Sequence, residues 1–167
     1  SDGLHSNGFS LVRKIVETVG LDWHAASPFD DAVSLGESLL TPTRIYVKPL
    51  LQAIRETGAV KGLVHITGGG FQENLPRILP DGCAALINLD SWPLPPVFNW
   101  LRRAGGIEDE ELLRTFNCGI GMIVVVDAAD AGMVTAQLKE AGETVYTVGQ
   151  MQEAEKPHVS FSGQIAS

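Results

Sequence analysis

Short apolar runs alternate along the chain with amphipathic segments that end at glycine, and this alternation restricts the fold more than any other feature. The apolar runs have the length of strands, whereas the segments between them repeat apolar residues every three to four positions, as helices do. We expect strands at residues 63–67, 83–89, 119–126, 144–148 and 158–161. We expect helices at residues 9–19, 34–40, 49–58, 71–79, 95–105, 131–141 and from 108 onward. This order predicts one layered α/β or α+β domain, and the number of helices favours a mixed sheet covered on both faces.

Charge and cysteine content narrow the class of function. The 167 residues carry 12 basic and 20 acidic side chains, a formal net charge of −8, which repels phosphate backbones and anionic lipid headgroups. We therefore expect neither nucleic acid nor a membrane as a main partner. Cys83 and Cys118 are far apart and have no C-x-x-C spacing, so neither a disulfide framework nor a metal site is expected. Because no apolar run reaches about 18 residues, we expect a cytoplasmic protein.

The segment Thr67-Gly68-Gly69-Gly70 is the first candidate for chemistry. A strand that ends in glycines and continues into a helix directs several backbone N–H groups at one point, and such a loop can hold a phosphate. The segment matches neither the Walker A pattern nor G-x-G-x-x-G. A tight corner without a ligand is the alternative.

Two further clusters are polar and rich in glycine. In residues 3–8, GLHSNG, an imidazole, a hydroxyl and an amide precede the first helix. These groups could bind a polar ligand. The alternative is that Ser6 or Asn7 only caps the helix. In residues 114–121, RTFNCGIG, polar groups and two glycines precede a buried strand. Cys118 has no histidine or cation beside it in the sequence, so we expect a buried structural thiol.

Four strings of the sequence, taken together, are similar to those of one enzyme family. They are GLHSNGFSLVRK at residues 3–14, LLTPTRIYVK at 39–48, HITGGGFQENLPRILP at 65–80, and FNW with RTFNCGIGM at 98–100 and 114–122. In this order they resemble the aminoimidazole ribonucleotide synthetases of purine biosynthesis, also called phosphoribosylformylglycinamidine cyclo-ligases. The resemblance extends from Ser1 to about Val148 and leaves residues 149–167 as a less distinctive tail.

The resemblance implies a fold and a reaction. These enzymes have two domains, and the chain resembles only the C-terminal one, a three-layer α/β/α arrangement of the α+β class with a mixed sheet that is partly ferredoxin-like. The family is homodimeric, and the N-terminal domain, absent from this chain, supplies much of the ATP site. With Mg²⁺ and ATP, the family closes the imidazole ring of formylglycinamidine ribonucleotide and releases ADP and phosphate. We expect the 167-residue chain to be inactive alone.

The same resemblance implies roles for single residues. It makes His5 the candidate catalytic group, for proton transfer or for stabilising the transferred phosphoryl group. It makes the glycine segment a cradle for the ribose phosphate of the substrate, with Arg44 as its cationic companion. The implied substrate-binding residues are Ser6, Asn7, Gly8, Arg44, Thr67, Gly68, Gly69, Gly70 and Asn117.

Two other functions stay open at this point. The superfamily includes thiamine monophosphate kinase and selenophosphate synthetase, so the chain can also resemble part of another ATP-dependent ligase or kinase. A stand-alone ligand-binding module is the second alternative. The strings TRIYVK, GGGFQENLPR and RTFNCGIGM favour the cyclo-ligase over the other enzymes of the superfamily, and the length of the source reading frame distinguishes the enzyme from the module.

Overall fold

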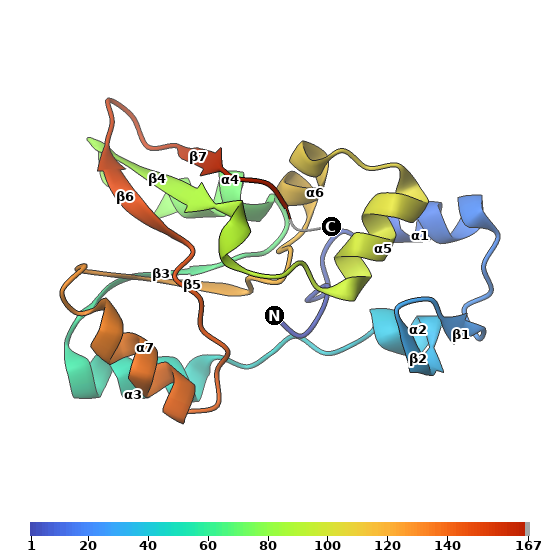
Figure 1. The fold of residues 1–167 in the computed structure, drawn as a ribbon, viewed down its shortest axis with the longest axis horizontal. Helices are drawn as coiled ribbons and strands as arrows, with labels where there is room; N and C mark the ends of the chain where they lie inside the picture. Colours follow the sequence, from blue (N-terminus) through green and yellow to red (C-terminus); the bar gives the residue numbers. More distant parts are fainter. Residues whose placement is uncertain (166–167) are drawn as a thin grey trace.

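The computed structural model describes residues 1–165, in which helices and strands alternate along the chain (Figure 1). The helices are α1 (Phe9–Val19), α2 (Leu35–Leu39), α3 (Val47–Thr57), α4 (Gly70–Asn74), α5 (Pro96–Gly105), α6 (Asp109–Thr115) and α7 (Ala131–Glu140). The strands are β1 (Ala26–Ser27), β2 (Asp30–Ser34), β3 (Val60–His65), β4 (Cys83–Asn88), β5 (Met122–Val126), β6 (Gly149–Glu153) and β7 (Val159–Ser162). Two short 3₁₀ helices, η1 (Leu75–Arg77) and η2 (Leu89–Ser91), follow α4 and β4.

The strands of residues 1–165 form three small sheets. β1 and β2 make an antiparallel hairpin, and β3 pairs antiparallel with β5, with His65 opposite Met122. In the third sheet β4 lies between two partners, antiparallel to β6 and parallel to β7. This third sheet is mixed, and the combination of helices with such a sheet confirms the α+β class.

Both faces of the β3–β5 sheet are covered. Helices α3 and α7 lie side by side against one face (Figure 1). The buried apolar residues of this smaller core are Leu50, Ala53, Ala59, Val134 and Leu138, with Leu63, Met122 and Val124 of the sheet packed against them. On the other face Val64 and Ile123 belong to the larger core, which they share with Ala85 and Ile87 of β4.

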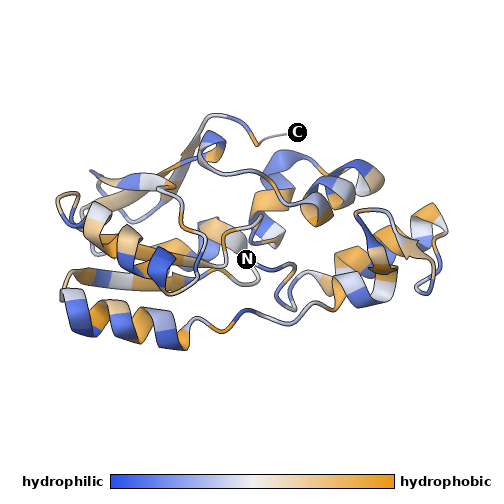
Figure 2. Ribbon diagram, turned by 60° about the horizontal axis from the view of Figure 1, so that its bottom comes forward, coloured by the Kyte–Doolittle hydropathy of each residue, from blue (hydrophilic) through white to orange (hydrophobic). Residues whose placement is uncertain are grey.

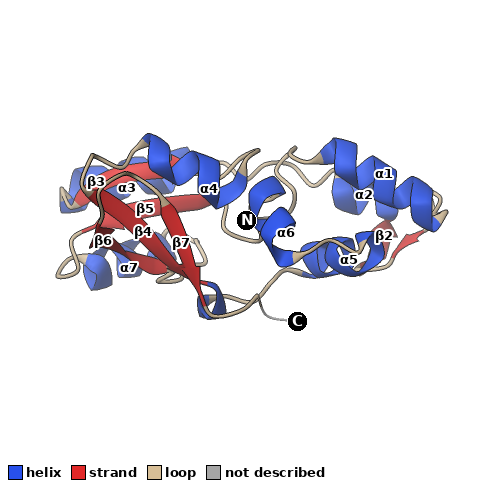
Figure 3. Cartoon of the chain, turned by 90° about the horizontal axis from the view of Figure 1, so that it is seen from above, coloured by secondary structure: helices blue, strands red, loops and turns tan. Residues whose placement is uncertain are grey.

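The larger core joins a strand-rich end of the molecule to a helical end. Seen from above, the β3–β5 and β6–β4–β7 sheets lie at one end and α1, α2 and α5 at the other, with the N-terminus between them (Figure 3). Hydrophobic and hydrophilic residues alternate along the longer helices (Figure 2), which gives each an apolar side to bury. The loop that precedes α1 therefore lies where the two ends meet.

Three predicted elements differ from the observed ones. The strand expected at residues 144–148 is wrong: the chain connects α7 to β6 there, and only Val148 reaches the ladder, where its carbonyl accepts from Asn88 N of β4 at 2.8 Å. The helix expected at residues 71–79 divides into α4 and η1, since Pro76 has no N–H to continue an α-helix. No strand was predicted between residues 20 and 34, where the structure has the β1–β2 hairpin.

The segment expected as a tail belongs to the domain. It supplies β6 and β7, the two strands on either side of β4. Its last two residues, 166 and 167, lie outside the described residues. The remaining predicted helices and strands are present, with ends shifted by a few residues.

Candidate functional site

The loop of residues 3–8 has an unusual backbone. His5 and Ser6 adopt positive φ angles of 52° and 60°, in the left-handed region that costs residues with a side chain roughly 1–3 kcal/mol each. Gly8, not Ser6 or Asn7, occupies the N-cap position of α1, and it provides no side-chain cap. The simple capping role considered for this cluster is therefore wrong. Consecutive residues held in such a conformation are typical of functional sites.

Asn7 connects this loop to the glycine segment. Its Oδ1 accepts a hydrogen bond from Gly68 N at 2.9 Å, and its Nδ2 donates to the carbonyl of His5 at 2.7 Å. The hydrogen bond from Gly68 to Asn7 spans 61 positions of the sequence and thus joins the two clusters. Ser6 lies beside them and is exposed.

The side chain of Asn74, which sequence reasoning missed, fixes the glycine segment by hydrogen bonds. This buried amide donates to the carbonyls of Gly70 at 2.7 Å and Gly68 at 3.2 Å, and its Oδ1 accepts from Thr67 Oγ1 at 3.2 Å. An asparagine one helical turn after three glycines is the signal that could have identified it. The loop is therefore fixed by its own hydrogen bonds before any ligand binds.

Several groups surround the N-terminal end of α4. The backbone N–H groups of Gly69, Phe71 and Gln72 have no acceptor within the described part of the chain. The side chain of Glu73 folds over Gly69, since a Cβ added to that glycine would lie 2.7 Å from Glu73 Cβ and closer still to its carboxylate. An anion that enters this loop must displace or neutralise that carboxylate.

His5 lies at the centre of these contacts and is 3% exposed. Its Nε2 accepts hydrogen bonds from two backbone amides, Asp2 N at 3.1 Å and Arg44 N at 3.4 Å. Its Nδ1 is buried and has no hydrogen-bond partner among residues 1–165. Burial is the main cause that lowers the pKa of His5 from 6.5 to about 4, so the ring is neutral at physiological pH.

Tyr46 and His65 complete an aromatic cluster around His5. The ring of His5 lies 6.1 Å from that of Tyr46 and 6.3 Å from that of His65, measured between centroids. The hydroxyl of Tyr46 is a second buried polar atom without a partner in the described chain. Burial, and then the carboxylates of Asp2 and Glu143, raise the pKa of Tyr46 to about 12. Sequence reasoning did not single out Tyr46, although it lies in the TRIYVK string.

Arg44 and Asn117 lie close to the cluster, but their side chains are engaged within the protein. The guanidinium of Arg44 pairs with Glu143 at 2.7 Å and with Asp2 at 3.3 Å, which compensates its positive charge. The amide of Asn117 is 1% exposed and holds the N-terminal segment through Gly3 O at 2.8 Å. A ligand contact by either side chain stays a prediction.

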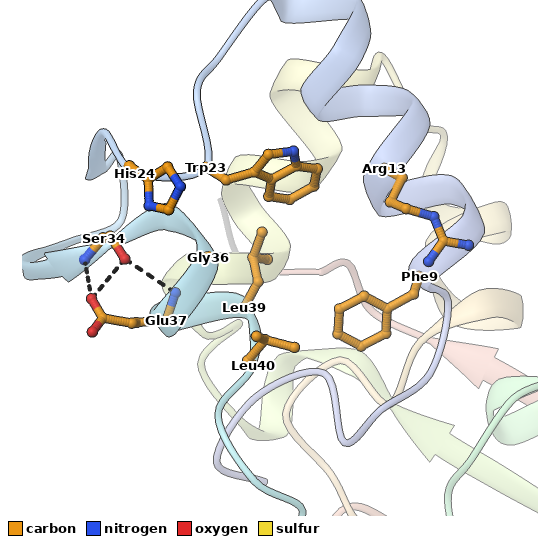
Figure 4. Close-up of a pocket in the computed structure, with 9 residues that line it drawn as sticks. All are labelled: Phe9, Arg13, Trp23, His24, Ser34, Gly36, Glu37, Leu39 and Leu40. Atoms are coloured by element: carbon orange, nitrogen blue, oxygen red, sulfur yellow. Dashed lines mark hydrogen bonds between the residues drawn. The ribbon is translucent and has the colours of Figure 1, made fainter.

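A cavity of about 680 Å³ lies elsewhere, between α1 and α2 (Figure 4). Its lining is largely apolar, with one arginine, one histidine and one glutamate at its edge. The lining residues are Phe9, Arg13, Trp23, His24, Ser34, Gly36, Glu37, Leu39 and Leu40. It contains none of the predicted site residues.

Two kinds of structural feature are absent from residues 1–165. Among these residues, no helix is long and apolar enough to cross a membrane. The same residues contain no group of three His, Cys, Asp or Glu side chains placed to hold a metal ion.

Comparison with known proteins then tests the resemblance. Residues 1–162 match the family described as "AIR synthase related protein, C-terminal domain". The match includes the His5 loop, the glycine segment, Tyr46, and both β6 and β7. The chain therefore belongs to the AIR synthase related family and carries its C-terminal domain.

Proposed function

We propose that this domain forms the substrate-binding half of an aminoimidazole ribonucleotide synthetase, a ligase that cyclises formylglycinamidine ribonucleotide with ATP. One observation carries the proposal: the four strings that resemble the cyclo-ligase meet around His5. Arg44 and Tyr46 come from TRIYVK, Asn7 joins the His5 loop to Gly68, and the RTFNCGIGM string passes beside the same ring.

Ring closure within one substrate needs the protein chiefly to hold the reacting atoms together and to stabilise developing charge. In the proposed arrangement the free N–H groups of Gly69, Phe71 and Gln72 bind the ribose phosphate. The buried His5 and the exposed Ser6 face the remainder of the substrate. The rigid loop lowers the entropy lost on binding, because Asn7 and Asn74 already fix it.

ATP and Mg²⁺ belong to the proposed reaction, but residues 1–165 contain no group of three His, Cys, Asp or Glu side chains that could hold a metal ion. No step is therefore assigned to Mg²⁺ at this site. We propose that an N-terminal domain binds most of Mg·ATP, and that the full-length enzyme is a homodimer in the cytoplasm.

The first experiment measures ADP release by the full-length protein with Mg·ATP, with and without formylglycinamidine ribonucleotide. Substrate-dependent ADP release supports the cyclo-ligase. A folded protein that binds ATP and shows no stimulation refutes this substrate, and the other ATP-dependent reactions of the superfamily then take its place.

The phosphate cradle is tested separately with Gly69→Val and Gly82→Val. Both glycines have a positive φ, of 91° and 89°, but Gly82 has open space around it and lies away from the site. We expect Gly69→Val to weaken substrate binding and Gly82→Val to leave it unchanged. Equal affinities in the two variants contradict the cradle.

Glu73→Gln gives an independent measure of the same loop. Removing the carboxylate that folds over Gly69 should tighten binding of inorganic phosphate, since like charge no longer opposes the anion. Glu110→Gln is the matched control, because Glu110 also lies in the first turn of a short helix. If both variants bind phosphate as the wild type does, the anion does not enter this loop.

A further inference from the structure

The hydrogen bonds to His5 determine which of its nitrogens carries the proton. Nε2 accepts from two backbone N–H groups, of Asp2 and Arg44, and a nitrogen that accepts hydrogen bonds has no proton of its own. The neutral ring therefore carries its proton on Nδ1. That Nδ1–H is a buried donor, and among residues 1–165 it finds no acceptor. A buried donor without an acceptor is costly and requires an explanation.

Tyr46 presents a second donor beside it. Its hydroxyl is buried and also unpaired within the described residues, so it does not bond to His5 directly. Because its pKa is raised, the phenol keeps its proton throughout the physiological range and can donate it. Two neutral donors thus lie side by side without an acceptor.

Gly121 shows that the two side chains meet at one point of the main chain. A Cβ added to Gly121 would lie 2.7 Å from His5 Cε1 and 3.0 Å from Tyr46 Cζ, and it would overlap the Tyr46 hydroxyl. Gly121 is not among the residues with a positive φ, so its backbone does not require glycine. The His5 ring and the Tyr46 hydroxyl therefore pack directly against the backbone of Gly121, and an added methyl group would displace them.

The charges around the pair favour an uncharged oxygen. Asp2 and Glu143 place two carboxylates near it, and the single guanidinium of Arg44 is bound to both. His65 lies 6.1 Å from Tyr46 and is exposed. The N-terminal ammonium of Ser1 is a second cation near His5, so the two carboxylates and the two cations balance. No positive charge is left over for a phosphate dianion, whereas a carbonyl or hydroxyl oxygen would accept both hydrogen bonds without one.

We propose that His5 Nδ1–H and the Tyr46 hydroxyl, which pack side by side against Gly121, together bind one uncharged oxygen of the ligand, a carbonyl or hydroxyl oxygen. In this role His5 positions the ligand as a neutral donor and does not act as a base. The identity of the ligand as formylglycinamidine ribonucleotide rests on the proposed function, but the arrangement of the two donors does not.

The first test concerns the chain alone. Long-range ¹H–¹⁵N correlation spectra of the 167-residue chain near pH 7 distinguish protonated from unprotonated ring nitrogens. We expect Nδ1 of His5 to be protonated and Nε2 to be unprotonated, and we expect the same in Tyr46→Phe. A proton on Nε2 overturns the donor pair, whatever the protein catalyses.

The second test concerns the ligand. Calorimetric titration of the full-length protein with formylglycinamidine ribonucleotide should show an affinity roughly 3- to 10-fold lower for Tyr46→Phe, the range expected for one lost hydrogen bond. Tyr146→Phe, which alters the other tyrosine of the chain, is the control and should bind as the wild type does. Equal affinities of all three proteins refute the site. If the wild type does not bind, the proposed function and the ligand assignment fail together, and the ring tautomer alone decides the donor pair.

A second pair of variants tests the position of the two donors, because a methyl group at Gly121 would displace them. Gly121→Ala should weaken binding, whereas Gly132→Ala, at a glycine of α7 with no atoms near the added Cβ, should not. Unchanged circular dichroism confirms that both variants fold. Normal binding by a folded Gly121→Ala contradicts the placement of the oxygen.

Discussion

Replacing Gly70 with alanine should lower the free energy of unfolding of the protein, even in the absence of a ligand. Gly70 has a φ of 56°, and an added Cβ would lie 2.8 Å from the carbonyl carbon of Leu113 and 3.2 Å from that of Arg114. Both are backbone atoms at the end of α6, so no side-chain rotation can relieve the overlap. Either α4 moves away from α6 or the backbone of both bends.

The expected loss has two parts. Placing alanine in the left-handed region costs roughly 1–2 kcal/mol, and forcing a methyl group into packed backbone costs roughly 1–3 kcal/mol. The free energy of unfolding of Gly70→Ala should therefore fall by roughly 2–5 kcal/mol. Gly20→Ala is the control, because Gly20 has a φ of 70° and no atom within 4 Å of the added Cβ. Gly20→Ala should lose only the roughly 1–2 kcal/mol that the left-handed conformation costs.

The assay is urea unfolding of both variants and the wild type, followed by tryptophan fluorescence and by circular dichroism. The difference between the two variants isolates the contact of α4 with α6 from the backbone conformation. If Gly70→Ala loses no more than Gly20→Ala, the close approach of the two helices does not stabilise the fold. The glycine would then serve the ligand instead of the packing.

Three other outcomes follow from the site. Burial lowers the pKa of His5 from 6.5 to about 4, so between these pH values the unfolded chain binds a proton that the folded chain does not. The free energy of unfolding should therefore fall by up to about 3 kcal/mol as the pH drops from 6.5 toward 4. Urea titrations of His5→Gln should show a weaker fall. Arg44→Ala should cost roughly 1 kcal/mol in urea unfolding and less at high salt, whereas Lys61→Ala, which breaks a more exposed ion pair, should cost under about half of that. Iodoacetamide should alkylate Cys83 but not Cys118 in the native protein, because burial raises the pKa of the Cys118 thiol. The intact mass of the protein, measured before and after adding urea, gives the number of alkylated cysteines.

The helices were predictable because their signals are local. In α1 the apolar residues recur at helical spacing, and Gly20 ends the helix in the left-handed conformation that glycine favours. The strands that were missed have no such signal. In β2, Asp30–Ser34, no residue is buried. In β6, an edge strand of its sheet, the polar residues Gln150 and Gln152 pair with residues of β4. Their pairing depends on partners distant in the sequence.

The site was predictable in its parts and not in its assembly. The His5 loop and the glycine segment were each recognisable by composition, but only the fold shows that Asn7 joins them. The charge of Arg44 was expected to be free for a phosphate. Its partner Glu143 lies 99 positions away, in a segment with no motif, so the compensation could not be read from the sequence.

Glycines show where reasoning from a single sequence reaches its limit. A glycine that ends a helix is explained by its φ angle, and it therefore identifies the scaffold. Gly121 has no positive φ and lies before a buried strand, where a larger residue would pack. Only its neighbours, the ring of His5 and the hydroxyl of Tyr46, account for it. A glycine that the backbone conformation does not require thus marks a place where other side chains pack directly against the main chain, and here those side chains carry two unpaired buried donors of the described chain. The same criterion separates Gly70, which the backbone of α6 requires, from Gly121, which the side chains of the two proposed donors require.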